Sequence, residues 1–318
     1  MRDPAIDPVP ARRRRRVARF LPATVTALIL AGCASPRDNV DYAAYEAALR
    51  ALGDLRTDTA PVDAPFSNED LVRNFARIAL RHEADIRLAG SESNAAPNPL
   101  QRWERPIRYS LFGSAATLRD MKEVDGFMGR IGRLTGLPVV PATTAPNLIV
   151  LITSSEERDA VQAALNQHHP ALGRSFALWR SSPEIVCAAT NLIAGANRHE
   201  IVFGLIMIGE EVRGLLRQSC LHEEITQALG LGNDHPAVRP SIFNDDEEFA
   251  LLTLHDQWLI RLLYDQRLSP GMTEREAVDV LRRILPDLRP SGGAGDPRGD
   301  LPPPHPTTRI DRVSRSSS

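Results

Sequence analysis

Apolar and polar positions change their spacing several times between residues 65 and 286, and each change predicts a strand or a helix. Residues 107–113 alternate between apolar and polar types, which is typical of a half-buried strand. Residues 148–153 form an apolar run rich in β-branched side chains, which predicts a buried central strand. Two more strands are predicted at 185–190 and 201–208, with a Gly-, Asn- and Arg-containing connection suited to a hairpin or a wide loop.

Apolar residues at helical spacing occupy the intervals between these strands and the region after them. Ser67 opens one helix as a capping residue, with Asp70 three positions later. An amphipathic helix that contains Phe127 and Ile131 ends at Gly136. Further helices are predicted at 156–166, 220–231, 246–265 and 273–285.

The order of these segments predicts the fold class α+β. Strands that alternate with helices favour a partly parallel, mixed sheet, and the adjacent pair of strands predicts one antiparallel edge packed on helices. We interpret 201–208 as the edge strand on which a substrate peptide could lie by β-augmentation. The helices at 246–265 and 273–285 would follow the sheet and close the domain.

The first 32 residues form a signal peptide and are not part of the fold. Five arginines at 12–16 precede an apolar stretch at 20–31, and these 12 residues are fewer than the roughly 20 that span a bilayer. Small residues then precede Cys33, as in the signals of bacterial lipoproteins, so we expect Cys33 to be lipidated. An ordinary secretory signal with a chance Cys is the alternative. Ala34 stands where an Asp would resemble an inner-membrane retention signal, which favours the outer membrane.

The rest of the chain divides into three parts. Residues 33–64 form a tether and a peripheral helix, in which Tyr42 and Leu49 follow helical spacing. Residues 65–286 form the domain. Residues 287–318 are dominated by Pro, Gly, Ser and Arg and predict a disordered tail.

The charge of the chain argues against a nucleic-acid partner. The 318 residues include 38 Lys+Arg and 40 Asp+Glu. Removal of the signal peptide takes away seven Arg and two Asp, which leaves 31 basic and 38 acidic residues and a net charge of about −7. A mildly acidic domain held by acyl chains suits the periplasm-facing side of a membrane. The expected partners are the lipid bilayer, through Cys33, and an extended peptide or another envelope protein.

Two cysteines follow Cys33 in the sequence. In an oxidising compartment, Cys187 and Cys220 would form a disulfide that closes a loop of about 34 residues and stabilises the fold by roughly 3–4 kcal/mol. Two buried free thiols are the alternative.

The segment from Cys220 to Asp234 has the spacing of a metal-dependent peptidase motif. Peptidases of the zincin class place two His four residues apart on one helix face, with a Glu beside the first as general base for a metal-bound water. A Gly then turns the chain, so that a third ligand arrives six residues after the second His. The residues in this frame are Glu223 and Gln227 at the two His positions, Glu224 at the base, Gly230 at the turn and Asn233 at the third ligand.

All three imidazoles are absent from this frame. Zinc prefers N and S donors, so one carboxylate and two amides predict a weak site, and oxygen donors suit a harder ion such as calcium. His222 lies about 100° around the helix from Glu223, and we interpret it as a solvated helix residue. Asn244 or Asp245 could fold back beside Glu223 and Asp234 to complete a polar pocket; capping of the next helix, near Phe249, is the alternative for this acidic run.

Together with its surroundings, this segment resembles an uncharacterised family of bacterial lipoproteins, a domain of unknown function with a degenerate metzincin motif. The resemblance implies a zincin-like fold over roughly residues 65–286 and no established reaction. The residues that carry it are Asn74-Phe75, Ile78-Ala79, Arg102-Trp103, Pro106-Ile107-Arg108, Glu223-Glu224-x-Thr226-Gln227-x-Leu229-Gly230-Leu231-x-Asn233-Asp234, Ser241-Ile242-Phe243-Asn244-Asp245, Leu262-Leu263-Tyr264-Asp265 and Pro270-Gly271-Met272.

We therefore expect an envelope lipoprotein whose domain binds a peptide or protein, or assists envelope assembly, without a cofactor. The alternative is a divergent metal-dependent hydrolase with Glu224 as general base and zinc or another divalent metal held by Glu223, Gln227, Asp234 or a distant His. A purely structural role follows if the polar helix face is buried in an internal hydrogen-bond network. The directions of Glu223, Gln227 and Asn233 in the fold separate these hypotheses.

Overall fold

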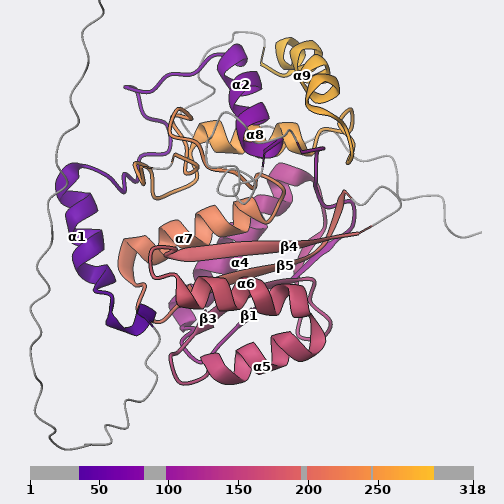
Figure 1. The fold of residues 1–318 in the computed structure, drawn as a ribbon. Helices are drawn as coiled ribbons and strands as arrows, with labels where there is room; N and C mark the ends of the chain where they lie inside the picture. The colour runs from indigo at the N-terminus through magenta and orange to yellow at the C-terminus, as the bar shows by residue number, and fades with distance from the viewer. Residues whose placement is uncertain (1–35, 82–97, 195–198, 245, 290–318) are drawn as a thin grey trace, which may run out of the picture. The chain divides into compact units, whose positions relative to one another are not determined.

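The computed structural model describes residues 36–81, 98–194, 199–244 and 246–289 (Figure 1). The predicted signal peptide, Cys33, Asp245 and residues 290–318 of the predicted tail lie outside these residues. The strands are β1 (Ile107–Phe112), β2 (Val139–Pro141), β3 (Leu148–Thr153), β4 (Cys187–Ala194) and β5 (Glu200–Gly209). The helices are the 3-10 turn η1 (Pro36–Asn39), α1 (Tyr42–Leu52), α2 (Asn68–Ala79), α4 (Leu118–Thr135), α5 (Arg158–His168), α6 (Pro170–Ser181), α7 (Gly214–Gln227), α8 (Leu254–Leu263) and α9 (Glu274–Leu288).

The five strands form one mixed sheet in the order β2-β1-β3-β5-β4. β1 is parallel to β2 and β3, β3 is parallel to β5, and β4 is antiparallel to β5. This confirms the predicted α+β class, the central position of 148–153 and the antiparallel edge.

The prediction that 201–208 is the edge strand is wrong. β5 lies between β3 and β4, and β4 is the strand at the edge. The burial of the side chains agrees with this order: β5 is buried on both faces from Gly204 to Ile208, as expected of an inner strand covered by helices on both sides of the sheet, whereas the residues of β4 are only partly buried.

Alternate residues of the central strands enter two different cores. Val150 and Ile206 face the main core, which also holds buried residues of α2, α4, α7, α8 and α9. Leu151 and Leu205 face a smaller core with Phe176 of α6. This period of two is the pleat of the sheet, and it explains why helices cover both faces: α5 and α6 lie on one side of the sheet and α4 and α7 on the other (Figure 1).

Capping residues fix several helix starts where the sequence predicts them. Ser67 and Asp70 form a capping box at α2, and Gly136 ends α4 in the left-handed region. The predicted start of a helix near Phe249 is wrong, because α8 begins only at Leu254, capped by Thr253.

The N-terminal segment contacts the domain from Arg37 onward, and α1 forms within the region in which a peripheral helix is predicted. Arg37 is fully buried and donates to the carbonyl oxygens of Trp179 (3.0 Å) and Val186 (2.6 Å). Its guanidinium also lies 4.3 Å from the centroid of the Trp179 ring. In the described part of the chain, the helices fall short of the length and apolar character that crossing a membrane requires.

Candidate functional site

Helix α7 is held firmly at its C-terminal end. Gly230 has φ +113°, and a Cβ there would lie 2.1 Å from the carbonyl oxygen of Gln101, so the turn accepts only glycine. The indole Nε1 of Trp103 donates to the carbonyl of Ala228 (2.8 Å), and the hydroxyl of Tyr264 donates to the carbonyl of Leu229 (2.9 Å). These contacts give physical roles to the Trp, Gly and Tyr of the predicted motif: they fix the direction in which α7 ends.

A cleft of about 620 Å³ lies between β4 and α7. Its walls come from five parts of the chain: α1, the end of α6 with the start of β4, β5, the last turns of α7, and the irregular segment after α7. Its lining residues are Tyr45, Ser175, Leu178, Trp179, Glu184, Ile185, Val186, Cys187, Ala188, Ala189, Thr190, Met207, Glu223, Glu224, Gln227, Asp234, Asn244 and Glu247.

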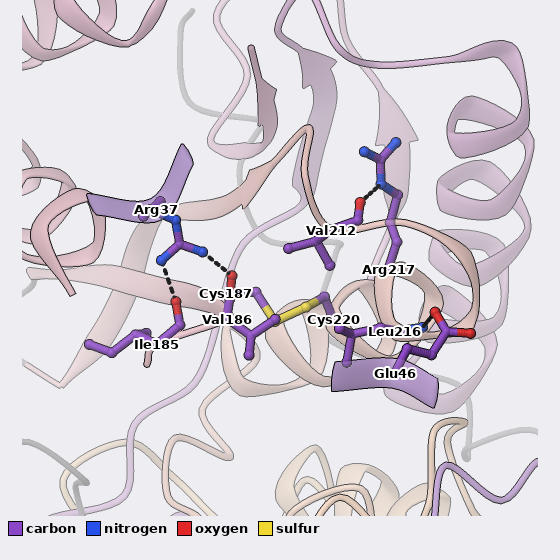
Figure 2. The surroundings of a disulfide bond; sticks show 9 residues. All are labelled: Arg37, Glu46, Ile185, Val186, Cys187, Val212, Leu216, Arg217 and Cys220. Carbon is purple, nitrogen blue, oxygen red and sulfur yellow. Dashed lines mark hydrogen bonds between the residues drawn. A yellow bond between two sulfur atoms is a disulfide. The ribbon is translucent and has the colours of Figure 1, made fainter. Parts of the chain in front are cut away.

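A disulfide joins the two principal walls of this cleft. Cys187, the first residue of β4, is bonded to Cys220 on α7, with an S–S distance of 2.03 Å and a Cα–Cα distance of 5.9 Å (Figure 2). This confirms the predicted pairing. The bond sets the spacing between the edge strand and the helix, next to the polar residues of the cleft.

The structure brings most of the predicted polar residues together at the cleft. Glu223, Glu224 and Gln227 line it from α7, and Asn244 lines it from the segment that follows. Nε2 of Gln227 donates to both carboxylate oxygens of Asp234, at 3.1 and 3.2 Å. The amide of Gln227 is therefore held by a neighbouring carboxylate inside the cleft.

Asn233 is turned away from this group. Its side chain is fully buried, and its Nδ2 donates to the carbonyl of Arg77 in α2 at 2.9 Å. Asn233 joins α2 to the turn after α7, and Asp234 enters the cleft in its place. The opposite directions of these two neighbouring side chains depend on contacts with distant parts of the fold, which the motif spacing does not predict.

His222 lies on the opposite side of α7 from the cleft, in the core. The interpretation of His222 as a solvated residue is wrong: its ring stacks on Phe127 at 4.2 Å, and its Nδ1 accepts from the backbone N–H of Leu252 at 3.0 Å. Burial lowers the pKa of His222 below its ordinary value. His222 is therefore a neutral packing residue at pH 7, and the cleft lining of the described residues contains no histidine.

The charge of the cleft lining is one-sided. Its described residues include five carboxylates and no Arg, Lys or His; the carboxylates are Glu184, Glu223, Glu224, Asp234 and Glu247. Tyr45 of α1 also lines the cleft, and burial together with Glu247 and Glu223 raises the pKa of its hydroxyl. Such a surface favours a cationic ligand.

Several lining residues were not identified as part of a site from the sequence, among them Tyr45, Leu178 and Glu184. Tyr45 shows helical spacing with Tyr42, but nothing in that spacing places α1 beside the cleft. Glu184 and Leu178 come from the region of α6, where Leu172, Phe176 and Trp179 at helical spacing after Pro170 would have predicted the helix.

The donor set does not fit the zinc of the zincin class. Of the three ligand positions in that frame, Glu223 offers a carboxylate, Gln227 offers an amide that is bonded to Asp234, and Asn233 points to Arg77. Zinc in such sites is held by three side chains with N or carboxylate donors aimed at one point. We therefore derive no chemical step through a metal held in that frame.

The fold and the cleft define an α+β domain with a mixed sheet and a disulfide-linked acidic cleft between its edge strand and a helix. The chain belongs to the family described as "Protein of unknown function (DUF2927)", whose model matches residues 68–283. This confirms that the chain belongs to an uncharacterised family, as predicted from the sequence. No curated protein and no solved structure matches the chain significantly.

Proposed function

We propose that this protein is an envelope lipoprotein whose domain, zincin-like in fold, binds an extended basic segment of a peptide or protein in the cleft between β4 and α7. The observation that carries the proposal is the cleft itself. An antiparallel edge strand, which among the described strands pairs with β5 alone, runs along it, and five carboxylates line it without a basic residue among the described lining.

The edge strand supports the binding of an extended chain. A peptide that adds to a sheet edge gains main-chain hydrogen bonds, and its alternate side chains point to the wall beneath. At β4 that wall is α7, which presents Glu223, Glu224 and Gln227. Arg or Lys at alternate positions of the peptide would meet these carboxylates, so charge selects the ligand while the strand binds its backbone.

The zincin-like relationship is supported by the order of elements. The antiparallel edge strand β4 and the strand β5 come directly before α7; α7 carries Glu223-Glu224, and the turn at Gly230 follows its last residue, Gln227, as the resemblance implies. Envelope localisation rests on the sequence around Cys33. The disulfide at Cys187 agrees with an oxidising compartment.

A metal-dependent hydrolase is the second candidate, and the position of Glu224 favours it. This carboxylate is only 4% exposed and lines the cleft at the position of the general base in the zincin frame. Peptide binding is the stronger proposal, because it uses the residues that converge and does not need the missing imidazoles. Cleavage of a bound peptide by the wild-type protein, lost in Glu224→Gln, would establish the hydrolase instead.

The test compares two fluorescent octapeptides that differ only in charge. One alternates Arg with Val, and the other alternates Glu with Val. We expect the basic peptide to bind at least about tenfold more tightly, a difference of about 1.4 kcal/mol.

Two variants locate the binding. The double variant Glu223→Gln, Glu224→Gln should weaken binding of the basic peptide about tenfold or more, whereas Glu123→Gln, a carboxylate outside the cleft, should leave it unchanged. Equal binding of the two peptides, or an equal loss in the Glu123 control, would contradict the proposal.

A further inference from the structure

Three potential metal ligands from two elements converge at the disulfide. The Sγ of Cys187 and carboxylate oxygens of Glu223 and Glu224 all lie within 4.8 Å of one another. Cys220, the disulfide partner, precedes Glu223 by one helical turn, so it lies on the same side of α7. The strand therefore contributes one sulfur and the helix contributes one sulfur and two carboxylates to a single place.

The disulfide prevents these residues from acting as a metal site, because the thiolate and not the disulfide sulfur is the metal ligand. A dithiol or monothiol reductant converts the two cysteines to thiols by thiol–disulfide exchange. Its thiolate attacks Sγ of Cys187, the S–S bond breaks, and Cys220 leaves as a thiolate. A second reductant thiol then displaces Cys187 from the mixed disulfide, so two reductant thiols are oxidised to a disulfide and two cysteine thiols are formed.

The accessibility of the two sulfurs matches this order of steps. Cys187 is partly exposed and lines the cleft, whereas Cys220 is 1% exposed and belongs to the main core. Figure 2 shows Cys187 beside Val186 at the start of the strand and Cys220 beside Leu216 on the helix. Attack from the cleft therefore reaches Cys187 first.

We propose that the reduced cleft binds a thiophilic divalent cation, of which Zn²⁺ is the representative, through the Cys187 thiolate and the carboxylates of Glu223 and Glu224. Thiolate and carboxylate oxygen are both ordinary zinc ligands, at about 2.3 and 2.0–2.2 Å. Cys220 supplies the fourth ligand when its sulfur moves away from that of Cys187, since two sulfurs on one zinc lie about 3.7 Å apart at tetrahedral angles. In this proposal the disulfide keeps the two sulfurs from binding a metal, and its reduction makes available a site whose ligands differ from those of the zincin frame.

Electrostatics favours the cation once the bond is reduced. Two thiolates and two carboxylates would bring up to four negative charges into a cleft whose described lining contains no basic side chain. A divalent cation offsets this repulsion, and binding releases the thiol protons. Metal binding would in turn slow the return of the disulfide, because both sulfurs would be bound to the ion.

The test uses two variants that lose the disulfide equally but keep different sulfurs. In Cys220→Ser, Cys187 remains with Glu223 and Glu224 and needs no reductant; in Cys187→Ser, the buried Cys220 is the one cysteine of the pair that remains, and Cys33 is the same in both variants. The probe is Co²⁺, whose thiolate-to-cobalt absorption reports a sulfur ligand directly. We expect Cys220→Ser to show this absorption and to bind Co²⁺ at least about tenfold more tightly than Cys187→Ser, because even second-shell changes cost about 10–100-fold in metal affinity.

Two further substitutions in the Cys220→Ser background identify the carboxylates. Glu223→Gln should weaken Co²⁺ binding by a similar factor, whereas Glu247→Gln, in the same cleft but outside the group of three, should not. Equal binding in the two serine variants, or no thiolate absorption in either while circular dichroism shows both folded, would overturn the proposal.

If neither serine variant folds, the wild-type chain decides the question. It is reduced by a phosphine with and without Zn²⁺. The proposal is supported if the reduced wild type keeps its native circular dichroism only with Zn²⁺ and the reduced Glu223→Gln variant loses it even with Zn²⁺. It is overturned if the circular dichroism of the reduced wild type is the same with and without Zn²⁺. This test has a metal readout and does not depend on peptide binding.

Discussion

Two hollows lie along α7, and their linings differ in charge: the first contains both basic and acidic residues, whereas the second contains acidic residues alone among its charged side chains. The first, of about 380 Å³, is lined by residues of α4 and the first turns of α7, and it contains three arginines and three carboxylates: Arg119, Arg213, Arg217, Asp120, Glu123 and Glu210. The second is the cleft beside β4, with five carboxylates and no basic residue among its described lining.

The first hollow is stabilised by its own charges. Arg217 donates to Asp120 at 3.1 Å, and both side chains are nearly buried. The described lining of the second hollow contains no Arg, Lys or His beside its five acidic residues. The two hollows therefore differ in charge balance: paired charges stabilise the first, and the one-sided charge of the second is the feature on which the proposed binding of a basic segment rests.

The largest expected loss of stability comes from removal of the buried ion pair in the first hollow. Asp120→Asn leaves the buried guanidinium of Arg217 without its carboxylate, which should lower the free energy of unfolding by about 3–5 kcal/mol. Urea denaturation at pH 7 measures this. Asp279→Asn, on the exposed side of α9, is the control and should change stability by less than about 0.5 kcal/mol.

The next effect concerns the covalent link, which only the second hollow has. Cys187→Ala with Cys220→Ala opens a loop with a sequence separation of 33 residues and should lower the free energy of unfolding by roughly 3–4 kcal/mol. Urea denaturation against the oxidised wild type measures the loss. A loss below about 1 kcal/mol would mean that packing alone fixes β4 against α7.

A smaller effect depends on pH and on His222, which lies between α7 and α4. Because burial lowers its pKa in the folded state, the unfolded chain binds a proton first as pH falls below about 6.5. Stability should therefore fall with decreasing pH in that range, by at most about 1.4 kcal/mol per pH unit from this residue. Urea titrations at several pH values should show that His222→Gln removes this component, and that His168→Gln, on an exposed part of α5, does not.

The smallest expected change in stability comes from removal of a cleft carboxylate, and it is compared with the loss in Asp120→Asn. Glu223→Gln removes one of two neighbouring carboxylates in the cleft, so stability should change by less than about 0.5 kcal/mol or rise slightly. Thermal unfolding, run beside Asp120→Asn, measures the contrast. A loss comparable to that of Asp120→Asn would show that the cleft carboxylates are structural.

The regular part of the fold could be predicted from the sequence, because it follows from local patterns. The apolar run of β3, the capping Ser67 and the terminal Gly136 all act within a few residues of themselves. The three residues of β2 are too few to show a period, and the edge position belongs to β4 because of pairing between distant segments. Local patterns do not contain such pairings.

Several residues of the candidate site could be predicted from the sequence, but the directions in which the side chains of Asn233 and His222 point could not. The spacing of Glu223, Glu224 and Gln227 on one helix placed them together, and the structure has them in one cleft. The direction of Asn233 depends on a carbonyl of α2, and that of His222 depends on Phe127 of α4. Contacts across more than 90 residues decide both, so motif spacing alone assigned these two side chains wrongly.

Amide hydrogen exchange of the oxidised protein, with and without the Arg-Val octapeptide, tests the central claim most directly. A peptide added to the sheet edge should slow exchange along β4 and over the last turns of α7, and should leave α5 and α9 unchanged. Slowed exchange confined to the first hollow, or none at β4 at a peptide concentration that saturates binding, would contradict the account.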